Sequence, residues 1–331
     1  MTDPLWITEA DVVEALSLPE AIPALESTLA LEAAGQARNM EKTHQIWGGH
    51  HTLHAIGAVV EGAKTVGTKT WAHTAGGATP LVTLWNSDTG KLEAIIEAFA
   101  LGQMRTGGIS GVATDRMAAR DADDLAIVGT GKQAITQVVA VAAVRKLKRI
   151  RVFSPTAENR RAFIGKLEKL FPTTTLVEAE SVAQAVKDAP IITLVTRART
   201  PILTAAMIAR GAHLNAVGAI TPEREEFTQD VFERVSAIAV DMVESVKTLS
   251  AEFQKRFGDG DWSPVRPLSE LVAAKAERPA NADITLFKAM GMGLSDLALG
   301  IEILKRVRAK GGGRAIPHPK PAQPRLLQSQ A

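Results

Sequence analysis

A short run in the middle of the chain has the residue types and spacing of a turn that binds phosphate groups. Gly129, Gly131 and Ala134 fit the pattern G-x-G-x-x-A between an apolar run and a predicted helix. The first glycine permits a tight turn, the second lets the backbone approach a diphosphate, and the small third residue lets the helix pack closely on the sheet. Amide groups at the helix start then bind the phosphates. We therefore predict a nicotinamide dinucleotide site, with a glycine turn that binds nothing as the alternative. The predicted contacts are Gly129, Thr130, Gly131, Lys132, Gln133 and Ala134.

The residues after the next predicted strand would select between NAD and NADP. NAD-binding folds usually place an aspartate or glutamate about 20 residues beyond the glycine pattern, where it accepts the ribose 2′-hydroxyl. Here the strand predicted over 150–153 is followed by Ser154, Thr156 and Arg160, with no carboxylate at its tip. Hydroxyl groups and arginines suit a 2′-phosphate, so we predict NADP, with contacts from these three residues. NAD remains the alternative, because Arg160 and Arg161 could equally form a solvated helix start.

The composition excludes several classes of protein and site. The 331 residues contain no cysteine, so disulfides, zinc thiolate sites and cysteine nucleophiles are excluded. The formal net charge is +2 and the 38 basic residues are scattered, which argues against a nucleic-acid partner. The most apolar long stretch, 125–144, contains Lys132, whereas a membrane span of about 20 residues needs few or no charges. The N-terminus lacks the pattern of a signal peptide, so we expect a cytoplasmic protein without a membrane partner.

Three neighbouring histidines, His50, His51 and His54, raise the question of a metal site. On a strand, His51 points to the opposite side from the other two, and no carboxylate lies at a helpful spacing. We therefore predict no metal site.

The glycine turn needs a sheet to hold it, and the chain after residue 124 alternates short apolar runs with helical ones. Such alternation predicts an α/β fold with a parallel, doubly wound sheet and right-handed crossovers. The predicted strands cover 125–128, 150–153, 174–177, 191–196, 212–217 and 237–240, and the predicted helical segments cover 131–146, 157–170, 182–187, 204–210 and 231–234.

The two ends of the chain follow a different pattern. The predicted elements are helices over about 8–34, short strands over 53–60, 67–71 and 81–84, one or two helices over 93–117, a strand over 284–287 and a helix over about 294–308. Ser17 and Pro19 lie where a second helix would start. Asp296 is interpreted as the cap of the last helix. Because the end of the chain is rich in glycine and proline, 313–331 is predicted to be a disordered tail.

Four stretches along the chain resemble the ornithine cyclodeaminase/μ-crystallin family. They are Gly-Thr-Lys-Thr-Trp over 67–71 with Gly-Gly-Ala-Thr-Pro-Leu over 76–81, Leu-Gly-Gln-Met-Arg-Thr over 101–106, the glycine turn with its Gln-Ala pair, and Ile-Thr-Leu-Phe-Lys from 284 running to Ser-Asp-Leu at 297. They occur in the family's order over residues 8–309, so the resemblance covers nearly the whole chain.

The resemblance implies a Rossmann-type domain inserted into an α+β lobe. Residues 121–287 would bind the dinucleotide, while 1–120 together with 288–312 would form a lobe for substrate binding and dimerisation, so a homodimer is expected. Members of the family include cyclodeaminases, alanine dehydrogenases, ketimine and pyrroline-carboxylate reductases, and a thyroid-hormone-binding crystallin. Its catalytic members act on amino or imino acids.

The resemblance also implies which residues form the substrate site. Lys69 matches the family's active-site lysine and Arg105 its carboxylate-binding arginine. An arginine can bind a carboxylate through two hydrogen bonds, and a desolvated lysine beside it can exchange a proton with a substrate nitrogen. Lys42 lies near the place of a second substrate-binding arginine, with Arg38 close by, and is expected to contact the substrate. His73 lies where the family places pocket residues and is a second candidate proton donor.

One departure from the family bears on the reaction. The family usually has Gly-Ala-Asp after the strand predicted over 212–217, and that aspartate acts on the substrate's amino group. This chain has Gly218, Ala219 and Ile220 there, and an isoleucine can neither take a proton nor attract an ammonium group. We therefore expect an oxidoreductase that uses NAD(P)H to reduce a small α-imino acid (a ketimine) to an amino acid, or the reverse. The alternatives are ammonia-eliminating cyclisation of the ornithine cyclodeaminase type with bound NAD, and a μ-crystallin-like NADP-dependent ligand-binding protein.

Overall fold

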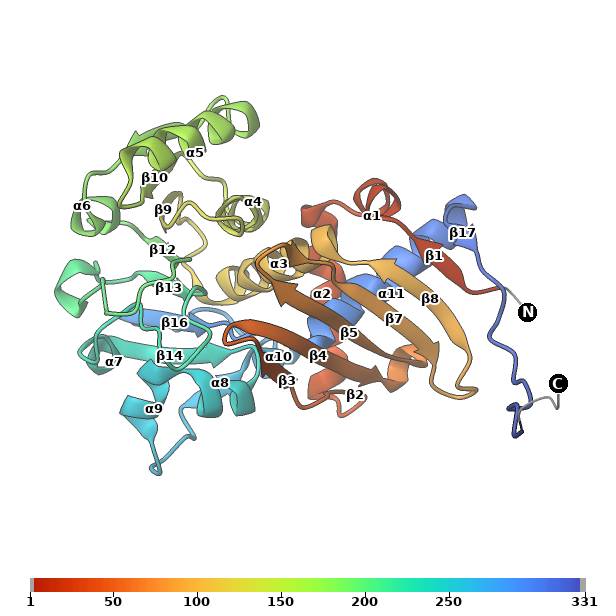
Figure 1. Ribbon diagram of the computed structural model, residues 1–331. Coiled ribbons are helices and arrows are strands. Elements are labelled where there is room, and N and C mark those ends of the chain that lie inside the picture. Colours follow the sequence, from red (N-terminus) through yellow and green to blue (C-terminus); the bar gives the residue numbers. More distant parts are fainter. Residues whose placement is uncertain (1–2, 328–331) are drawn as a thin grey trace.

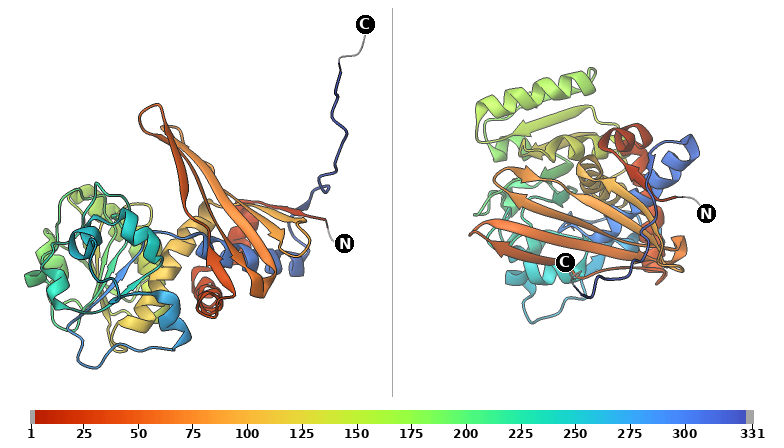
Figure 2. Two further views of the ribbon diagram at one scale, coloured as in Figure 1. Left: turned by 90° about the horizontal axis from the view of Figure 1, so that it is seen from below. Right: turned by 45° about the vertical axis from the view of Figure 1, so that its right-hand side comes forward.

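The computed structural model describes residues 3–327, which form two lobes that are each built around one β-sheet (Figure 1). Both ends of the described chain lie in the right-hand lobe of Figure 1, and the middle of the chain forms the left-hand lobe. Helices cover both faces of the sheet on the left but only one face of the sheet on the right (Figure 2). The predicted α/β class is therefore confirmed.

The left-hand lobe contains a parallel sheet of eight strands. They are β9 (Asp124–Val128), β10 (Arg149–Phe153), β11 (Thr175–Glu178), β12 (Ile191–Leu194), β13 (His213–Ala216), β14 (Val235–Val240), β15 (Val265–Pro267) and β16 (Ile284–Lys288). They lie in the order β11-β10-β9-β12-β13-β16-β14-β15, and every neighbouring pair is parallel. The chain runs outward from β9 to β11 and resumes on the other side of β9 with β12, so the direction of winding reverses between β9 and β12. This is the doubly wound arrangement that the alternating pattern predicts.

The helices of this lobe differ in part from the prediction. They are α4 (Ala134–Val144), α5 (Ala157–Leu170), α6 (Val182–Val186), α7 (Val231–Arg234), α8 (Val243–Leu249), α9 (Ala251–Phe257) and α10 (Leu268–Ala273). The segment predicted as a helix over 204–210 forms only a 3-10 turn, Ala205–Met207. No element was predicted for the segment that contains α8, α9, β15 and α10. These short helices form through tertiary packing, because helices of this length need tertiary contacts to be stable. On α9, Phe253 and Phe257 contact Phe232 edge to face.

The right-hand lobe contains a sheet of nine strands. They are β1 (Leu5–Ile7), β2 (Ala37–Asn39), β3 (Thr43–Trp47), β4 (His51–Val60), β5 (Thr65–Thr74), β6 (Gly77–Ala78), β7 (Leu81–Asn86), β8 (Leu92–Glu97) and β17 (Arg314–Ala315), with the 3-10 turn Glu61–Ala63 after β4. The order is β17-β1-β8-β7-β5-β4-β2, with β3 paired to β4 and β6 to β5. The start of 93–117 is thus a strand and not a helix. Ala94 and Ile96 are buried between less buried neighbours, which is the alternation of a strand.

Three long helices cover one face of this sheet: α2 (Leu18–Ala33), α3 (Phe99–Met117) and α11 (Gly293–Lys310), with the short α1 (Glu9–Ala15) beside them. A capping box starts α1, formed by Thr8 with Asp11, and another starts α2, formed by Ser17 with Glu20. The opposite face, which we call the outer sheet face, is free of helices (Figure 2). The register places on it Leu53, Ala55, Thr68, Thr70, Ala72, Leu81, Thr83, Trp85, Ile95 and, opposite Leu81, Glu97.

The end of the chain is more ordered than expected. Strand β17 lies within the segment predicted to be a disordered tail, and it pairs with β1 at the edge of the sheet. Residues 328–331, which belong to the same prediction, lie outside the described residues. Within residues 3–327, no helix has the length and apolar character that a bilayer crossing requires.

Helix α3 joins the two lobes. It packs on α2 in its own lobe and on α4 in the other. The approach to α4 is close because Gly107 lacks a side chain: a Cβ there would lie 2.7 Å from the Thr136 carbonyl oxygen. This packing holds the preceding turn of α3, which carries Arg105, at the junction of the lobes.

Candidate functional site

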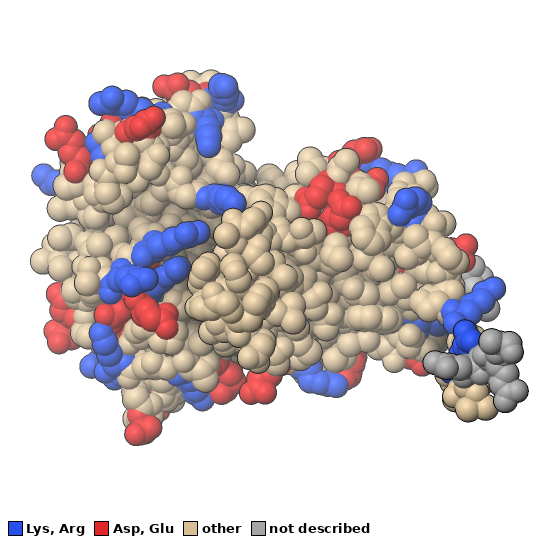
Figure 3. Space-filling view, in the orientation of Figure 1, with Lys and Arg blue, Asp and Glu red and all other residues tan. Residues whose placement is uncertain are grey.

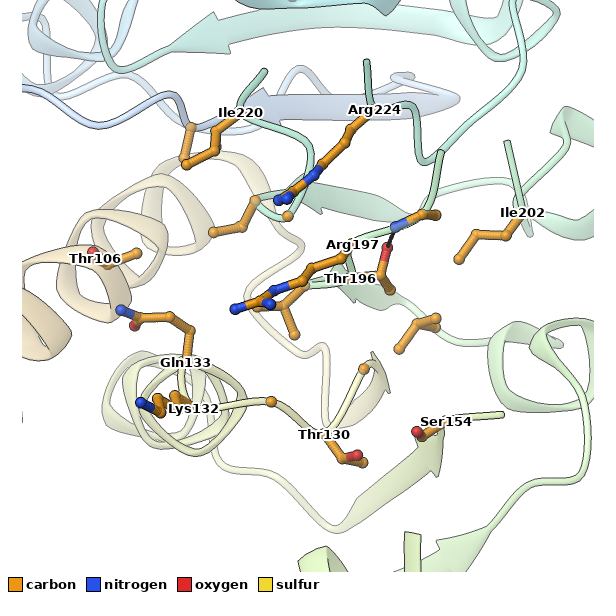
Figure 4. Close-up of a pocket in the computed structure, with 18 of the residues that line it drawn as sticks. Thr106, Thr130, Lys132, Gln133, Ser154, Thr196, Arg197, Ile202, Ile220 and Arg224 are labelled. Atoms are coloured by element: carbon orange, nitrogen blue, oxygen red, sulfur yellow. Dashed lines mark hydrogen bonds between the residues drawn. The ribbon is translucent and has the colours of Figure 1, made fainter. Parts of the chain in front are cut away.

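A cavity of about 930 Å³ lies where the lobes meet, at the carboxyl ends of β9, β10, β12 and β13 (Figure 4). Its wall also includes Arg105 on α3, Asp241 after β14, and Met290 and Gly291 after β16. Ligand pockets usually measure about 300–1,000 Å³, so this cavity can hold a ligand much larger than an amino acid. In open α/β sheets, ligands bind at this edge, beside the point where the strand order reverses.

The predicted glycine turn forms one wall of the cavity. Gly129 has a φ of +111°, and a Cβ there would lie 2.6 Å from the Val195 carbonyl oxygen, so this position requires glycine. Nothing lies within 4 Å of where a Cβ on Gly131 would be, which leaves room for a diphosphate beside the backbone. Ala134 is buried at the first position of α4 and does not line the cavity. The turn residues that line it are Gly129, Thr130, Gly131, Lys132 and Gln133.

The end of β10 differs from the prediction. Ser154 and Asn159 line the cavity, but Thr156 does not. Arg160 turns away from it: Nη1 donates a hydrogen bond to the Ser154 carbonyl oxygen at 2.8 Å, and Nε donates to Glu178 at 3.0 Å. Arg160 was predicted to contact a 2′-phosphate, but its guanidinium does not line the cavity. It is used instead to hold the end of β10 and to pair with the carboxylate of Glu178.

Lys69 lies on the helix-covered face of β5, and its partner comes from the first turn of α11. Its Nζ lies 2.7 Å from Oδ1 of Asp296, and both side chains are buried. Burial lowers the pKa of Lys69, the charge of Asp296 raises it, and the charge of Arg105 lowers it further. A lysine with a lowered pKa gives up its proton more readily. Asp296 is therefore not a helix cap as interpreted, but the carboxylate that holds this lysine.

Arg105 extends from α3 toward the same carboxylate. Its Nε lies 3.4 Å from Oδ1 of Asp296. The guanidinium lies beside Gly291, where a Cβ would be 3.1 Å from Nη1. The buried Nε has no hydrogen-bond partner in the described part of the chain. Arg105 lines the cavity, so its guanidinium is open to a carboxylate bound there; that it binds the substrate carboxylate stays a prediction.

Lys42, just before β3, adds a third cation. Burial lowers the pKa of Lys42, Arg105 acts in the same direction, and Asp241 opposes them, so these groups lie close together. Lys42, Lys69 and Arg105 thus face two carboxylates, Asp241 and Asp296. A third carboxylate, Glu32, also lies near Asp241: burial and the charge of Asp241 raise the pKa of Glu32.

His73 does not lie beside Lys69 in the substrate site. It lies on the same face of β5 as Lys69, but it is exposed near the end of the strand and does not line the cavity. The ring beside the lysine is that of Trp71, whose centroid lies 5.2 Å from Lys69 Nζ. His54 stacks on Trp71 with ring centroids 4.6 Å apart. Burial, followed by the charge of Lys42, lowers the pKa of His54 to about 4, so this ring is neutral near pH 7.

No metal-binding group appears in the described residues: no three histidine, aspartate or glutamate side chains there are placed to hold an ion.

Several charged residues of the cavity were missed by sequence reasoning. Asp241 accepts hydrogen bonds from the backbone amides of Met290 at 2.9 Å and Gly291 at 2.6 Å, and burial raises its pKa. Arg197 and Arg224 also line the cavity, and so does Ile220. Asp241 and Arg197 each directly follow a predicted strand, 237–240 and 191–196, so the first charged residue after a strand was the signal that could have found them.

The fold and the cavity define a two-lobe protein whose ligand site lies between a doubly wound sheet and a helix-backed, mostly antiparallel sheet. The chain belongs to the ornithine cyclodeaminase/mu-crystallin family, whose model matches residues 3–311. The predicted family is therefore confirmed.

The similar proteins include reductases and dehydrogenases. A Delta(1)-pyrroline-2-carboxylate reductase from Bacillus cereus is 29% identical over 272 residues, which cover 80% of this chain and 81% of the relative. An NAD(P)H-dependent anabolic L-arginine dehydrogenase from Pseudomonas aeruginosa is 26% identical over 319 residues, 93% of this chain and 98% of the relative. Among solved structures, Thermococcus litoralis Delta(1)-pyrroline-2-carboxylate reductase in complex with NADH and L-proline has a TM-score of 0.87 and 25% identity, and the match covers 94% of this chain and 100% of that one.

Proposed function

We propose that this chain is an NAD(P)H-dependent oxidoreductase that reduces a small α-imino acid to an amino acid, or runs the reverse reaction. The observation that carries this proposal is the buried Lys69–Asp296 pair beside the guanidinium of Arg105. Arg105 lines the cavity that contains the glycine turn, whereas Lys69 and Asp296 lie behind it and do not line the cavity themselves. The relatives support it, because they are named as reductases of a cyclic imino acid and as a dehydrogenase of an amino acid.

The roles of the residues follow from their positions. Arg105 binds the substrate carboxylate through its guanidinium fork, and Lys42 adds a second positive charge. Lys69, with its lowered pKa, donates a proton to the imine nitrogen, while Asp296 keeps the lysine in place. A bound NAD(P)H supplies the hydride that the imine carbon gains. One hydride and one proton convert C=N to CH–NH, and the reverse reaction returns both.

The cofactor proposed is NADP in preference to NAD. The residues fit a dinucleotide, because the space beside Gly131 is open. No aspartate or glutamate lines the cavity at the end of β10, where Ser154 and Asn159 lie, and both of these side chains can donate hydrogen bonds to a 2′-phosphate. We expect a higher kcat/KM with NADPH than with NADH at saturating substrate. A higher value with NADH would contradict the preference.

Two roles are further proposed for the lobes. Residues 1–120 with 288–312 form the substrate and dimerisation lobe, and 121–287 form the cofactor lobe. We infer a homodimer joined through the outer sheet face, because this face is almost free of charged side chains (Figure 3) and includes the apolar Leu53, Trp85 and Ile95. Large exposed apolar patches mark interaction sites.

Ornithine-type cyclisation is the weaker candidate, since Ile220 lines the cavity and offers no carboxylate to an amino group. Cyclisation would release ammonia without net use of cofactor. A ligand-binding protein would neither release ammonia nor consume cofactor.

The test of the proposal is a screen of NAD(P)H oxidation with 2-oxo acids plus ammonia or methylamine, and with preformed cyclic imines. We expect one or more imines to be reduced with stoichiometric use of cofactor. Lys69→Ala should lower kcat roughly 10²–10⁴-fold, the usual contribution of a positioned acid. The exposed Lys166→Ala on α5 serves as the matched control. If no imine is reduced, or if Lys69→Ala retains full activity, the proposal fails.

A further inference from the structure

Two arginines in the cavity wall have no part in the reaction described above. Arg197 follows β12 and Arg224 lies in the loop after β13, and both side chains extend into the cavity (Figure 4). Within residues 3–327, neither guanidinium has a hydrogen-bond or ion-pair partner. Arg224 is partly buried, whereas Arg197 is exposed at the mouth. Guanidinium groups placed in this way are suited to bind an anion that comes from outside the protein.

The loops that carry the two arginines are held by one buried carboxylate. Glu226 accepts hydrogen bonds from the backbone amides of Thr196 at 2.8 Å, Gly218 at 2.8 Å and Ala219 at 3.1 Å. The fully buried Lys288 donates a further hydrogen bond to the Ala219 carbonyl oxygen at 2.6 Å. The starts of both loops are therefore fixed to each other, so the arginines project from an anchored part of the structure.

The order of the strands places Arg224 at the substrate end of the cavity. The glycine turn follows β9, β12 is the neighbour of β9, and β13 lies one strand farther from the turn. Beyond β13 lie β16 and β14, whose ends carry Gly291 and Asp241 beside Arg105. A dinucleotide that binds across this edge has its diphosphate at the turn and its reactive ring farther along the sheet. Arg224 therefore lies nearer to the expected position of the substrate than to the expected position of the diphosphate.

The charges support a second anionic group on the substrate. The α-carboxylate already has Arg105 and Lys42, and the diphosphate has the amide groups of the turn and the start of α4. Arg197 has no carboxylate partner in the described part of the chain, and the charge of Arg224 acts on the exposed carboxylate of Glu223, its neighbour in the chain. Ile220, from the same loop as Arg224, lines the cavity next to it and offers an apolar surface (Figure 4).

We propose that the substrate is an imino acid with a second carboxylate at the end of its side chain, and that Arg224, with Arg197 beside it, binds this group. Ile220 contacts the short apolar stem between the two carboxylates. The second carboxylate takes no part in the transfer of hydride and proton; it fixes the orientation of the imine. This inference rests on the proposed reductase function.

The test compares matched substrates on the full chain with saturating NADPH or NADH. Imines form in solution from ammonia with oxaloacetate or 2-oxoglutarate, and from ammonia with pyruvate or 2-oxobutyrate, which lack the second carboxylate. We expect kcat/KM to be roughly tenfold or more higher for the dicarboxylic members. Arg224→Gln should lower kcat/KM for these members roughly 10–100-fold, the usual effect of losing a charged hydrogen bond. It should leave the values for pyruvate and 2-oxobutyrate nearly unchanged, and Arg224→Lys should retain part of the preference.

Arg199→Gln is the matched control, because Arg199 is an exposed arginine of the same loop as Arg197 and does not line the cavity. It should leave the preference intact. Equal efficiency for both substrate classes overturns the inference while the reductase function stands. An increase in the KM for NAD(P)H with every substrate in Arg224→Gln also overturns it, because the arginine would then bind the diphosphate. If no imine of either class is reduced, the inference is overturned; the reductase function itself fails only if the methylamine imines and the preformed cyclic imines are not reduced either.

Discussion

The protonation state of Lys69 determines how fast each direction of the reaction runs at a given pH. Its buried position removes water from the ammonium, and the pKa is lowered although Asp296 stabilises the charge. A proton donor must be protonated, so imine reduction should fall as the pH rises through the pKa of Lys69. Amine oxidation needs the neutral lysine and should rise over the same range. The two directions should therefore have opposite pH dependence, governed by the same group.

Removal of the Asp296 charge provides a direct test of this assignment. Because Asp296 raises the pKa of Lys69, Asp296→Asn should move both limbs of the pH profile to lower pH. The measurement is kcat/KM in each direction from neutral to alkaline pH, with circular dichroism to confirm that the variant is folded. Glu302→Gln, on the same helix but away from the cavity, is the control. A limb that stays in place or moves to higher pH would exclude Lys69 as the proton donor.

The helix over 157–170 was predicted with its observed bounds. The glycine turn around Gly129 was predicted at its place, although the helix after it covers Ala134–Val144 and not 131–146. The pattern of the turn is local, since each glycine is required by backbone geometry within a few residues. The strand Leu92–Glu97 was missed because its sequence places two isoleucines, Ile95 and Ile96, side by side, although its burial alternates. The strand Val265–Pro267 and the helices of 243–273 were missed because they are short and depend on tertiary packing. The same limit applies to side chains. Arg160 has the right type and position for a 2′-phosphate, yet it binds Glu178, and that partner is 18 residues away in the chain. Asp296 pairs with Lys69 across 227 residues, which spacing along the sequence cannot reveal.

The two glycines of the turn should respond differently to alanine. A Cβ on Gly129 would lie 2.6 Å from Val195 and φ is positive, so Gly129→Ala should disturb the sheet and lower Tm by several degrees. A Cβ on Gly131 would meet no protein atom within 4 Å, so Gly131→Ala should keep its Tm. It should nevertheless weaken NAD(P)H binding roughly tenfold or more, because the methyl group occupies the space of the diphosphate. Thermal unfolding and fluorescence titration of the cofactor measure the two effects. Unchanged cofactor affinity in Gly131→Ala would show that the diphosphate binds elsewhere.

The site takes its parts from both lobes, so its geometry depends on how they are joined. Lys69 and Arg105 belong to the nine-stranded lobe, whereas the glycine turn, Arg224 and Asp241 belong to the other. Helix α3 makes the connection, since it packs on both α2 and α4. Helix α11 returns the chain to the first lobe and brings Asp296 to the lysine. One lobe therefore positions the acid and the carboxylate-binding fork, and the other positions the cofactor.

The outer sheet face gives the last prediction. In a twofold dimer, one patch contacts the same patch of the partner, so a charge added near its centre would be introduced twice. Thr70 is exposed on β5 in the middle of this face. We expect the wild-type chain to be a dimer and Thr70→Arg to dissociate it, because unpaired like charges in an interface cost several kcal/mol. Size-exclusion chromatography with light scattering over a range of concentrations measures the mass. Ala162→Arg, an equal change at an exposed position on α5, should leave the dimer intact. A Thr70→Arg variant that stays dimeric at the same concentrations would place the interface on another surface.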